Sequence, residues 1–460
     1  MNSPLTNYQT RDLQSLIHPY TNAVALRKTG AHFVEKGEGV YVFDNNNKKY
    51  LEGMSGLWCC GLGFSDPELI EAAKIQIEKL PYYHLFGGRS HEPAVELAEK
   101  IMELTPGKMG RVFYQSSGSE ANESQVKLAW YYNNARGLKN KKKIISRKKG
   151  YHGVSIVSAS LTGLPYNHKH FDLPLNFVKH TETPHYWREQ THKETEEAFS
   201  IRIAQELEKL IIKEDPNTIA AFIAEPVMGA GGVIIPPKNY FSEIGKVLKK
   251  YDILQISDEV ICGFGRTGEW FGSQTLGMEP DAISMAKQLT AGYAPLSAVA
   301  ITEEMAEVIE AQTGEVGNFG HGFTYGGHPV GCSVGIKALQ IYRERNIVDR
   351  VKNLSPIFKA KLDSYMDKPI VGESRSIGLM GALELTPNKT PEPFKEIGKV
   401  GAKMASELLK NGVMVRAIGD TIAFCPPMII TEEQIDELFD PVEEALNSTR
   451  DWAFSEGLLN

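Results

Sequence analysis

The sequence has few cysteines, and they form no metal-binding or disulfide pattern. Five cysteines are scattered over 460 residues, and none belongs to a C-x-x-C motif. An odd, scattered set in a long chain is typical of reduced intracellular proteins, so we expect free thiols and a cytoplasmic location. His180, His185 and His192 are spaced too widely for a zinc signature, so the sequence predicts no metal site.

Long apolar runs and a positive net charge are also missing. No run is long enough to cross a bilayer, and residues 1–22 lack the basic-then-apolar order of a secretory signal. The net charge of -7 argues against a nucleic-acid-binding protein. We therefore interpret the basic run 139–149 as the solvated flanks of a strand. The sequence predicts partners that are neither nucleic acids nor membranes.

The composition is that of an ordered protein with a large core. Hydrophobic residues make up 42% of the chain and charged residues 23%, and the length favours two domains. Short apolar runs alternate with helix-periodic segments in the middle of the chain. The expected strands are 111–116, 219–225, 253–258, 282–286 and 296–301, and the expected helices are 120–136 and 240–251. Buried strands separated by helices indicate a parallel sheet covered on both faces.

The pattern changes beyond residue 330. A long helix at about 330–345 is followed by further helices and by short strands at 379–385 and 413–417. We interpret this part as a second, α+β domain. The predicted limits are 1–65 for an N-terminal segment that completes the small domain, 66–330 for the large domain and 331–460 for the small domain.

Two glycine-containing stretches are candidate phosphate sites. SSGSEANE follows a strand and opens a helix, with Ser117 and Glu120 at capping-box spacing and Gly118 at the turn. Backbone N–H groups and hydroxyls at a helix N-terminus can bind a phosphate, although a simple helix cap is the commoner use. HGFTYGGHP, at 321–329, is either a second phosphate contact or a loop that leads into a helix.

Two acids follow an apolar strand in ILQISDEVICGFGRTG. Asp258 and Glu259 stand at the carboxyl edge of the predicted sheet, where open α/β sheets bind ligands. A carboxylate there can hold a proton on a ring nitrogen, but a helix cap or a salt bridge is also possible. The G-x-G-x-x-G spacing in the same segment does not indicate a dinucleotide site, because no helix-forming sequence follows it.

A lone lysine lies in the apolar segment DAISMAKQLTAGYAPLSAVA. Apolar and small residues surround Lys287, and desolvation lowers the pKa of a lysine. A lysine with a lowered pKa is a nucleophile. The alternative is an ordinary lysine at a strand end whose ammonium reaches water.

Taken together, these segments resemble those of the class III aminotransferases, which depend on pyridoxal 5′-phosphate (PLP). The segments that carry the resemblance occur in the family's order, as SGSEAN, KGYHG, EPVMGAGG, SDEVICGFGRTG, MAKQLTAGYAPLSAV and HGFTYGGHP. They span nearly the whole chain, and the likeness extends to the ω-transaminases. The resemblance implies an α/β fold of the PLP-dependent, aspartate aminotransferase-like type I, with a large mostly parallel-sheet domain and a smaller α+β domain.

The resemblance also implies roles for residues at the cofactor. Lys287 would form the Schiff base with PLP and later move the substrate's proton, for which a neutral amine is needed. Asp258 would keep the ring nitrogen of PLP protonated. Val260, two residues on and expected on the same side of the strand, would pack on one face of the ring. Tyr151 would stack on the other face.

Further cofactor contacts imply an oligomer. Gly118 and Ser119 match the family's phosphate contacts, and Thr324 matches a phosphate ligand that the neighbouring subunit supplies. The resemblance therefore implies a homodimer, or a tetramer, with shared active sites. Glu225 falls where the family keeps an active-site glutamate.

Four residues are implied at the substrate. Arg416 matches the arginine that binds the carboxylate of a keto acid, for which a bidentate guanidinium is suited, although a surface arginine is the alternative. Trp58 and Phe86 align with aromatic pocket walls, but they could equally be core aromatics, and Tyr151 would also contact the substrate. The sequence departs from the family at Gln288, where glycine is usual.

The resemblance predicts a PLP-dependent aminotransferase with a ping-pong mechanism. The expected donor is an amine or ω-amino acid such as taurine, β-alanine, 4-aminobutyrate or a diamine. The expected acceptor is an α-keto acid, with pyruvate as the first choice. The alternatives are a PLP-dependent aminomutase or decarboxylase of the same fold, and a PLP-binding regulatory protein without catalysis.

Overall fold

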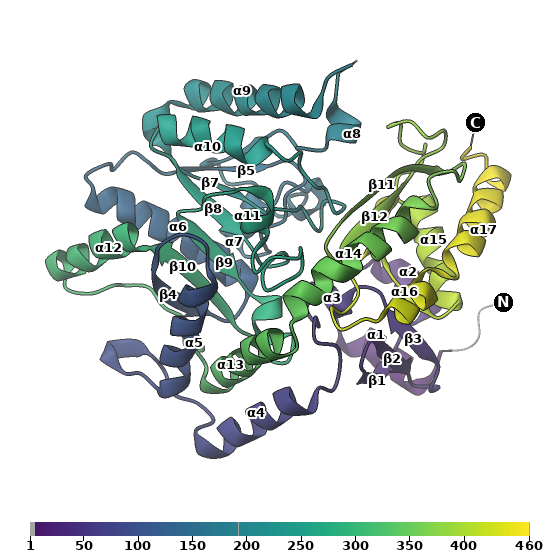
Figure 1. Ribbon diagram of the computed structural model, residues 1–460, viewed down its shortest axis with the longest axis horizontal. Coiled ribbons are helices and arrows are strands. Elements are labelled where there is room, and N and C mark those ends of the chain that lie inside the picture. Colours follow the sequence, from purple (N-terminus) through teal and green to yellow (C-terminus); the bar gives the residue numbers. More distant parts are fainter. Residues whose placement is uncertain (1–4, 192, 460) are drawn as a thin grey trace.

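A computed structural model of the chain describes residues 5–191 and 193–459. At its centre is a seven-stranded sheet with the order β4-β10-β9-β8-β7-β5-β6 (Figure 1). The strands of this sheet are β4 (Met109–Gln115), β5 (Lys143–Arg147), β6 (Val178–Thr181), β7 (Ile219–Ala224), β8 (Leu254–Asp258), β9 (Ala282–Met285) and β10 (Ser297–Thr302). Neighbouring strands from β9 to β6 run parallel, whereas β10 is antiparallel to both β4 and β9. The predicted mostly parallel sheet is confirmed, with one antiparallel strand that the sequence did not indicate.

The helices of this part of the chain range from four to nineteen residues, and several begin at a side-chain cap. They are α4 (Pro67–Lys79), α5 (Glu92–Leu104), α6 (Gly118–Ala135), α7 (Ile156–Leu161), α8 (Tyr186–Glu189), α9 (Glu196–Glu214), α10 (Tyr240–Lys250), α11 (Gly272–Leu276), α12 (Glu303–Val316) and α13 (Pro329–Glu344). Four short 3-10 turns are η1 (Phe86–Gly88), η2 (Pro165–Asn167), η3 (Pro216–Thr218) and η4 (Lys287–Thr290). Asp66 shows why α4 begins where it does. Its side chain accepts from the N–H groups of Glu68 and Leu69, and α4 has proline in its first turn.

Helices cover both faces of the sheet, as predicted. Phe222 of β7 belongs to a buried cluster with Phe199 of α9 and Ile244 of α10. The next residue, Ile223, belongs to another buried cluster with Val126 of α6. Successive residues of a strand point to opposite faces, so one apolar strand serves two cores. This layering leaves the carboxyl ends of the parallel strands available for a site.

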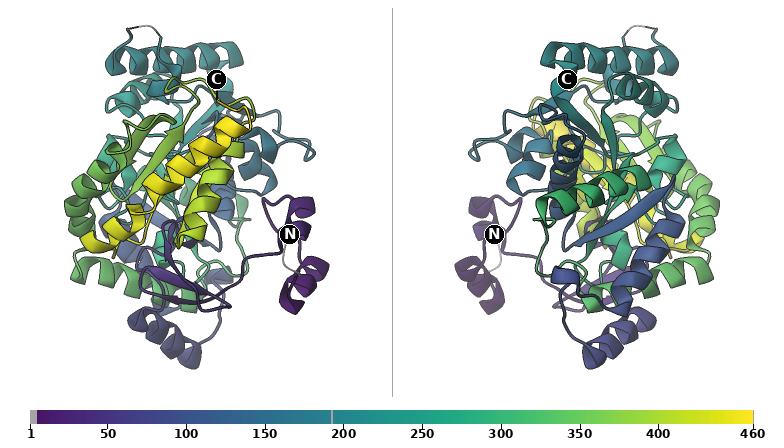
Figure 2. Two further views of the ribbon diagram at one scale, coloured as in Figure 1. Left: turned by 90° about the vertical axis from the view of Figure 1, so that its right-hand side faces the viewer. Right: turned by 90° about the vertical axis from the view of Figure 1, so that its left-hand side faces the viewer.

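Two smaller sheets flank this layer. The N-terminal elements are α1 (Asn7–Ser15), α2 (Ala23–Thr29), β1 (Val34–Glu38), β2 (Tyr41–Asp44), β3 (Lys49–Glu52) and α3 (Ser55–Trp58). The C-terminal elements are α14 (Ile347–Asp363), β11 (Val371–Ile377), β12 (Met380–Leu385), α15 (Lys399–Lys410), β13 (Val413–Met414), β14 (Arg416–Ile418), β15 (Thr421–Phe424), α16 (Glu432–Phe439) and α17 (Val442–Ser455). Figure 2 shows α1 and α2 at the side of the molecule, apart from the main body.

The prediction of a single strand at 413–417 is wrong, because the structure has two short strands there, β13 and β14. β13 pairs in parallel with β3, whereas β14 pairs antiparallel with β15. The chain therefore passes from one small sheet to the other at Val415, and each sheet takes a short piece. The β13–β3 pair joins the N-terminal segment to the C-terminal part of the chain, and the predicted domain limits stay predictions.

The basic run 139–149 is not solvated throughout, so that interpretation is wrong for two of its residues. The run forms β5 and its flanks, but Lys141 and Arg147 are buried. Lys141 Nζ donates to the carbonyl oxygen of Tyr251 at 3.1 Å, and the Arg147 guanidinium donates to that of Glu225. Backbone oxygens therefore compensate part of the cost of burying these two charges. Within 5–191 and 193–459, no helix combines the length and apolar character that crossing a bilayer requires.

Candidate active site

The carboxyl end of β8 carries a buried carboxylate surrounded by donors. Asp258 is the last residue of that strand and is 3% exposed. Its Oδ2 lies 2.7 Å from Asn122 Nδ2 and 2.8 Å from His152 Nδ1, and its Oδ1 accepts from the backbone N–H of Val260 at 3.1 Å. Three donors around one carboxylate compensate for the loss of water on burial.

The neighbouring acid has a different task. Glu259 accepts from the backbone N–H groups of Gly272 at 2.9 Å and Ser273 at 2.7 Å, which begin α11. It therefore caps a short helix and compensates the positive end of that helix. Ligand contact, helix cap and salt bridge were open for this pair of acids. The structure gives Glu259 the cap and leaves Asp258 in the site.

Asn122 and His152 are residues that the sequence analysis did not single out. Both lie inside motifs that carried the family resemblance, SGSEAN and KGYHG, and Asn122 Nδ2 also donates to the carbonyl oxygen of His152 at 2.8 Å. Nothing in the sequence links positions 122, 152 and 258 directly. Only the packing of α6 and the loop after β5 around the end of β8 brings them together.

The N-terminus of α6 lies against the same strand end. Ser117 caps the helix by accepting from the N–H of Glu120 at 3.2 Å. A Cβ added at Gly118 would lie 3.1 Å from both methyl groups of Val260, so a larger residue would crowd the start of the helix. The start of α6 therefore lies beside the turn that follows Asp258, and its backbone N–H groups can serve an anion.

Ser119 and Val260 complete this cluster, with one correction. Ser119 Oγ accepts from the N–H of Val154 at 3.1 Å. Val260 was expected to share a strand face with Asp258, but β8 ends at Asp258 and Val260 lies in the following turn. The physical reason is the hydrogen bond from the N–H of Val260 to the Asp258 carboxylate, which turns the chain.

Lys287 begins η4 and is partly exposed. Its backbone has φ 47°, in the left-handed region. Burial lowers the pKa of the Lys287 amine, while the nearby Cys59, Asp258 and Glu225 raise that pKa and the Arg416 guanidinium lowers it. The lysine therefore lies within electrostatic reach of both predicted active-site acids and of the predicted carboxylate-binding arginine.

The side chain of Glu225 bonds the backbone of Tyr151. Glu225 Oε1 accepts from the N–H of Tyr151 at 2.9 Å, and its Oε2 accepts from the N–H of Gly229 at 3.0 Å. Burial raises the pKa of Glu225. Burial also raises the pKa of Tyr151, while Arg416 lowers it. Glu225 thus holds the segment that presents Tyr151, and the charge of Arg416 lowers the pKa of both Tyr151 and Lys287.

The remaining predicted residues are not all brought to this place. Trp58 is 1% exposed and belongs to a core cluster, whereas the adjacent Leu57 is 58% exposed. Phe86 is 48% exposed, and a Cβ added at Gly322 would lie 3.0 Å from its ring. Thr324 is exposed in the same loop. In a single chain, Phe86 and Thr324 therefore form a separate surface, and the substrate and cofactor roles of these residues stay predictions.

The residues at the end of β8 fit PLP. The N–H groups and hydroxyls at the start of α6 suit a phosphate, the Asp258 carboxylate suits a protonated ring nitrogen, and the Lys287 amine suits an aldehyde. Space at the helix start also supports a phosphate there, because any residue larger than glycine at position 118 would crowd Val260. Asp258, Gly118, Ser119, Val260 and Lys287 are the residues that would hold the cofactor.

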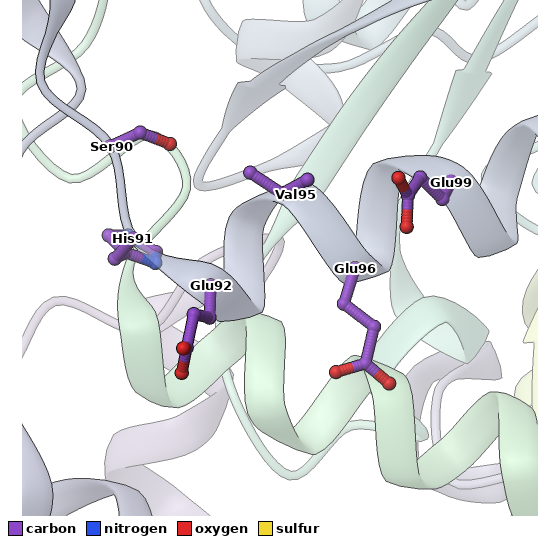
Figure 3. A pocket seen from close by; sticks show the side chains of 6 residues that line it. All are labelled: Ser90, His91, Glu92, Val95, Glu96 and Glu99. Carbon is purple, nitrogen blue, oxygen red and sulfur yellow. The ribbon is translucent and has the colours of Figure 1, made fainter.

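A hollow of ≈ 380 Å³ lies elsewhere, along α5 (Figure 3). It is lined by Ser90, His91, Glu92, Val95, Glu96 and Glu99. None of the predicted site residues lines it. Its three glutamates would repel the phosphate of PLP and the carboxylate of a keto acid, so we assign it no role.

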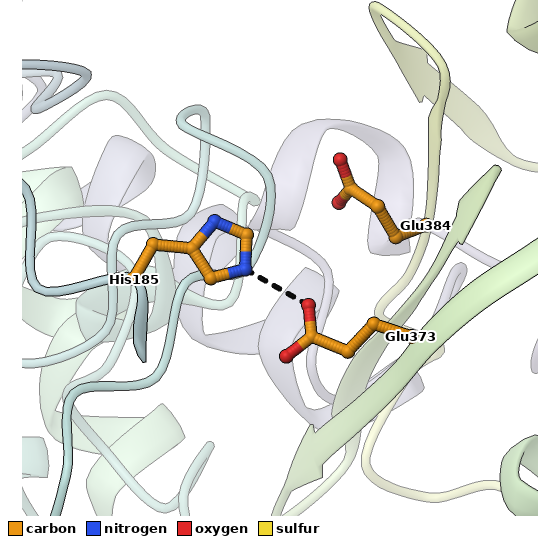
Figure 4. A group of neighbouring side chains, drawn as sticks. All are labelled: His185, Glu373 and Glu384. Carbon is orange, nitrogen blue, oxygen red and sulfur yellow. Dashed lines mark hydrogen bonds and ion pairs between the residues drawn. The ribbon is translucent and has the colours of Figure 1, made fainter. Parts of the chain in front are cut away.

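A buried group of side chains meets the distances of a metal site. The ligand atoms of His185, Glu373 and Glu384 lie within 4.8 Å of one another (Figure 4). Arg375 donates to both carboxylates, and Arg188 Nη2 lies 2.5 Å from Glu384 Oε1. Two guanidiniums already balance the two carboxylates and would repel a cation, so we interpret the group as an ion-pair cluster. That the chain binds no metal stays a prediction. Of the three histidines considered in the sequence analysis, His192 lies outside the described residues.

This ion-pair cluster gives a stability prediction. Arg375→Ala is expected to lower the free energy of unfolding by about 3–5 kcal/mol, because it leaves the buried Glu384 and the half-buried Glu373 without their shared partner. The measurement is urea unfolding at fixed protein concentration. The control is Arg343→Ala, which removes an exposed ion pair with Glu103 and should change the value by less than about 1 kcal/mol. Equal effects of the two variants would contradict the prediction.

Known proteins are similar to this chain in sequence and in fold. The chain matches the family described as aminotransferase class-III over residues 23–446. It is 50% identical over 440 residues to gamma-aminobutyrate transaminase 1, mitochondrial, of Oryza sativa subsp. japonica, covering 95% of this chain and 85% of that protein. It is similar to the omega transaminase of Pseudomonas jessenii in complex with PMP, at 47% identity and a TM-score of 0.96, covering 97% of this chain and 99% of that one. Because the family match spans most of the chain and the fold agrees, the chain belongs to the class III aminotransferases, which are PLP-dependent enzymes of fold type I.

Proposed function

We propose that this aminotransferase takes an amino group from an ω-amino acid or amine and gives it to an α-keto acid, with pyruvate as the expected acceptor. The observation that carries the proposal is the buried Asp258 carboxylate, which Asn122 and His152 hold at the end of β8. The charge of Arg416, which lowers the pKa of the Lys287 amine, supports an acceptor that carries a carboxylate. The relatives named as gamma-aminobutyrate and omega transaminases support the donor class. We therefore place 4-aminobutyrate first among the donors.

The side chains divide the chemistry among them. Bound PLP supplies an electron sink for the pair left on the substrate carbon. Asp258 holds the proton of the ring nitrogen, and Lys287 Nζ carries a proton to and from the substrate's Cα. The lowered pKa of Lys287 favours the neutral amine that this transfer needs. Arg416 orients the acceptor by its carboxylate. Lys287 and Asp258 serve both half-reactions, and the amino group stays on the enzyme between them, which accounts for a ping-pong order.

An absorbance experiment tests the proposal and its rivals. The purified holoenzyme is mixed with 4-aminobutyrate, β-alanine, taurine, putrescine or a simple amine, and the cofactor band is followed. A donor should bleach the visible band without a keto acid, and pyruvate should then restore it. Steady consumption of a donor without any keto acid would favour a decarboxylase or an aminomutase. A cofactor band that responds to no amine would favour a binding protein without catalysis.

Arg416 gives a substrate-specific prediction. Arg416→Ala should lower kcat/KM for pyruvate by about 10–100-fold, since a hydrogen bond to a charged group contributes about 1.5–3 kcal/mol. With an amine donor that has no carboxylate, the rate of the donor half-reaction should change by less than about threefold. Single-turnover kinetics with each substrate separate the two effects. An equal loss in both half-reactions would show that Arg416 does not act through the acceptor's carboxylate.

We also propose that the enzyme is a homodimer or a tetramer of such dimers. Tyr83, Phe86 and Tyr325 are exposed aromatics, and Tyr325 is 61% exposed beside the exposed Thr324. Tyr82 links the two segments, because its hydroxyl donates to the carbonyl oxygen of Thr324 at 2.9 Å. An exposed apolar surface of this kind favours association. Light scattering should give the mass of two or four chains, and a monomeric mass would contradict the proposal.

The location in the cell is a proposal too. We propose a cytoplasmic enzyme, because the five cysteines are free thiols in the structure. The name of the Oryza sativa relative includes mitochondrial, so an organelle is the competing location. Cell fractionation with an antibody to this chain distinguishes the two.

A further inference from the structure

Gln288 follows Lys287 directly and departs from the glycine usual in the family. It is 1% exposed, and its side chain makes contacts that glycine could not make. Its Oε1 accepts from the N–H of Gly61 at 3.1 Å and from the hydroxyl of Tyr342 at 3.2 Å. Its Nε2 donates to the carbonyl oxygen of Trp58 at 3.3 Å. A buried amide with all these partners is a fixed point in the fold.

The contacts join two distant stretches of the chain. One is η4, which carries Lys287, and the other is the segment 56–61, which we call the wall segment. A Cβ added at Gly61 would lie 2.1 Å from Gln288 Oε1, so the amide is packed directly on the backbone of the wall segment. Trp58 inserts its ring into the core below, and Gln288 holds its carbonyl oxygen.

The wall segment borders the site at Lys287. Lys287 lowers the pKa of Cys59, which burial raises, so the two side chains are within electrostatic reach. A Cβ added at Gly292, just after η4, would lie 3.2 Å from the Cβ of Cys59. Leu57 is 58% exposed. The position of these side chains relative to Lys287 depends on the bonds of Gln288.

Both stretches hold backbone conformations that side chains disfavour. Trp58 has φ 65° and Lys287 has φ 47°. Non-glycine residues in the left-handed region persist only where their surroundings hold them. Gln288 bonds the carbonyl oxygen of Trp58 and directly follows Lys287 in sequence, so it can hold both.

We propose that Gln288 is a positioning residue, which fixes the wall segment at a set distance from Lys287 and thereby determines which amine donors are accepted. The inference rests on the proposed function, because it concerns the donor side of the same site. A fixed wall favours donors whose apolar part packs against it. A wall that moves loses that contact for a large donor, whereas a small donor that does not reach the wall is unaffected.

The test is Gln288→Met, which keeps the volume of the side chain and removes its hydrogen bonds. Steady-state kinetics with pyruvate compare 1-phenylethylamine with isopropylamine. The ratio of kcat/KM for the aromatic donor to that for the small donor should fall about tenfold, mainly through KM of the aromatic donor. Tyr342→Phe is the control, because it removes the hydroxyl but leaves the bonds of Gln288 to Trp58 and Gly61. Its ratio should stay within about twofold of the wild type.

A second variant and a double variant make the result decisive. Gly61→Ala is the substitute test if Gln288→Met does not fold. Its added methyl group would displace the Gln288 amide from the wall segment, so it should lower the same ratio. Once Leu57→Ala has removed the exposed wall side chain, Gln288→Met should lower the ratio no further. An unchanged or raised ratio, or equal loss for both donors, overturns the inference. A wild-type enzyme that transaminates neither amine overturns the proposed function instead.

Discussion

Lys287→Ala is expected to abolish amino transfer. The variant removes the nucleophile that joins the cofactor and the amine that moves the substrate's proton. Proton transfer by a positioned side chain contributes about 10²–10⁴-fold, so turnover should fall by at least about 10³-fold when both tasks are lost. Stopped-flow measurement of the donor half-reaction is the direct assay. Full activity in the variant would refute the role of Lys287.

A matched control separates chemistry from loss of structure. Lys141 is a buried lysine, and its Nζ donates to the carbonyl oxygen of Tyr251, just before the start of β8 and so at the opposite end of that strand from Asp258. Lys141→Ala should lower the unfolding temperature yet keep the rate of the half-reaction per folded molecule. Borohydride reduction followed by peptide mapping gives the independent check. The reduced cofactor should be found on the peptide that contains Lys287 in the wild type.

The sequence could predict the elements that carry the site, because each depends on local pattern. A short apolar run that ends in acids predicts the strand before Asp258, and the cap residues and the glycine predict the start of α6. Lys287 stood out because it is charged within an apolar segment. Each of these features can be identified from the local sequence alone, without the order of the strands in the sheet. The expected helices 120–136 and 240–251 match α6 and α10 to within two residues at each end.

Contacts between distant segments could not be predicted in this way. Asn122 and His152 reach Asp258 only because α6 and the loop after β5 pack on the same strand end. The burial of Arg147 depends on the carbonyl oxygen of Glu225 and on the aromatic rings of α10 around its guanidinium. The division of 413–417 between two sheets depends on strand pairing. Tertiary packing decides each of these cases, and a single sequence does not record it.

Asp258→Asn is the second substitution with a large expected effect. The carboxylate accepts from Asn122, His152 and the N–H of Val260, and it is buried. These donors all favour a negative charge at this place, and that charge holds the proton on the ring nitrogen of PLP. An asparagine of nearly the same shape has no charge, so it cannot stabilise that proton. The rate of proton removal from the donor should fall about 10³-fold, as for other preorganised electrostatic groups.

The comparison with Glu259→Gln distinguishes this effect from general damage. Glu259 is as deeply buried and lies one residue away, but it bonds the start of α11. Glu259→Gln should lower stability, since a buried cap is weakened, and should change the rate at saturating PLP by less than about threefold. A similar loss of rate in both variants would mean that Asp258 acts only by supporting the strand end. A large loss in Asp258→Asn alone would place the required charge at the end of β8, where the three donors already hold it.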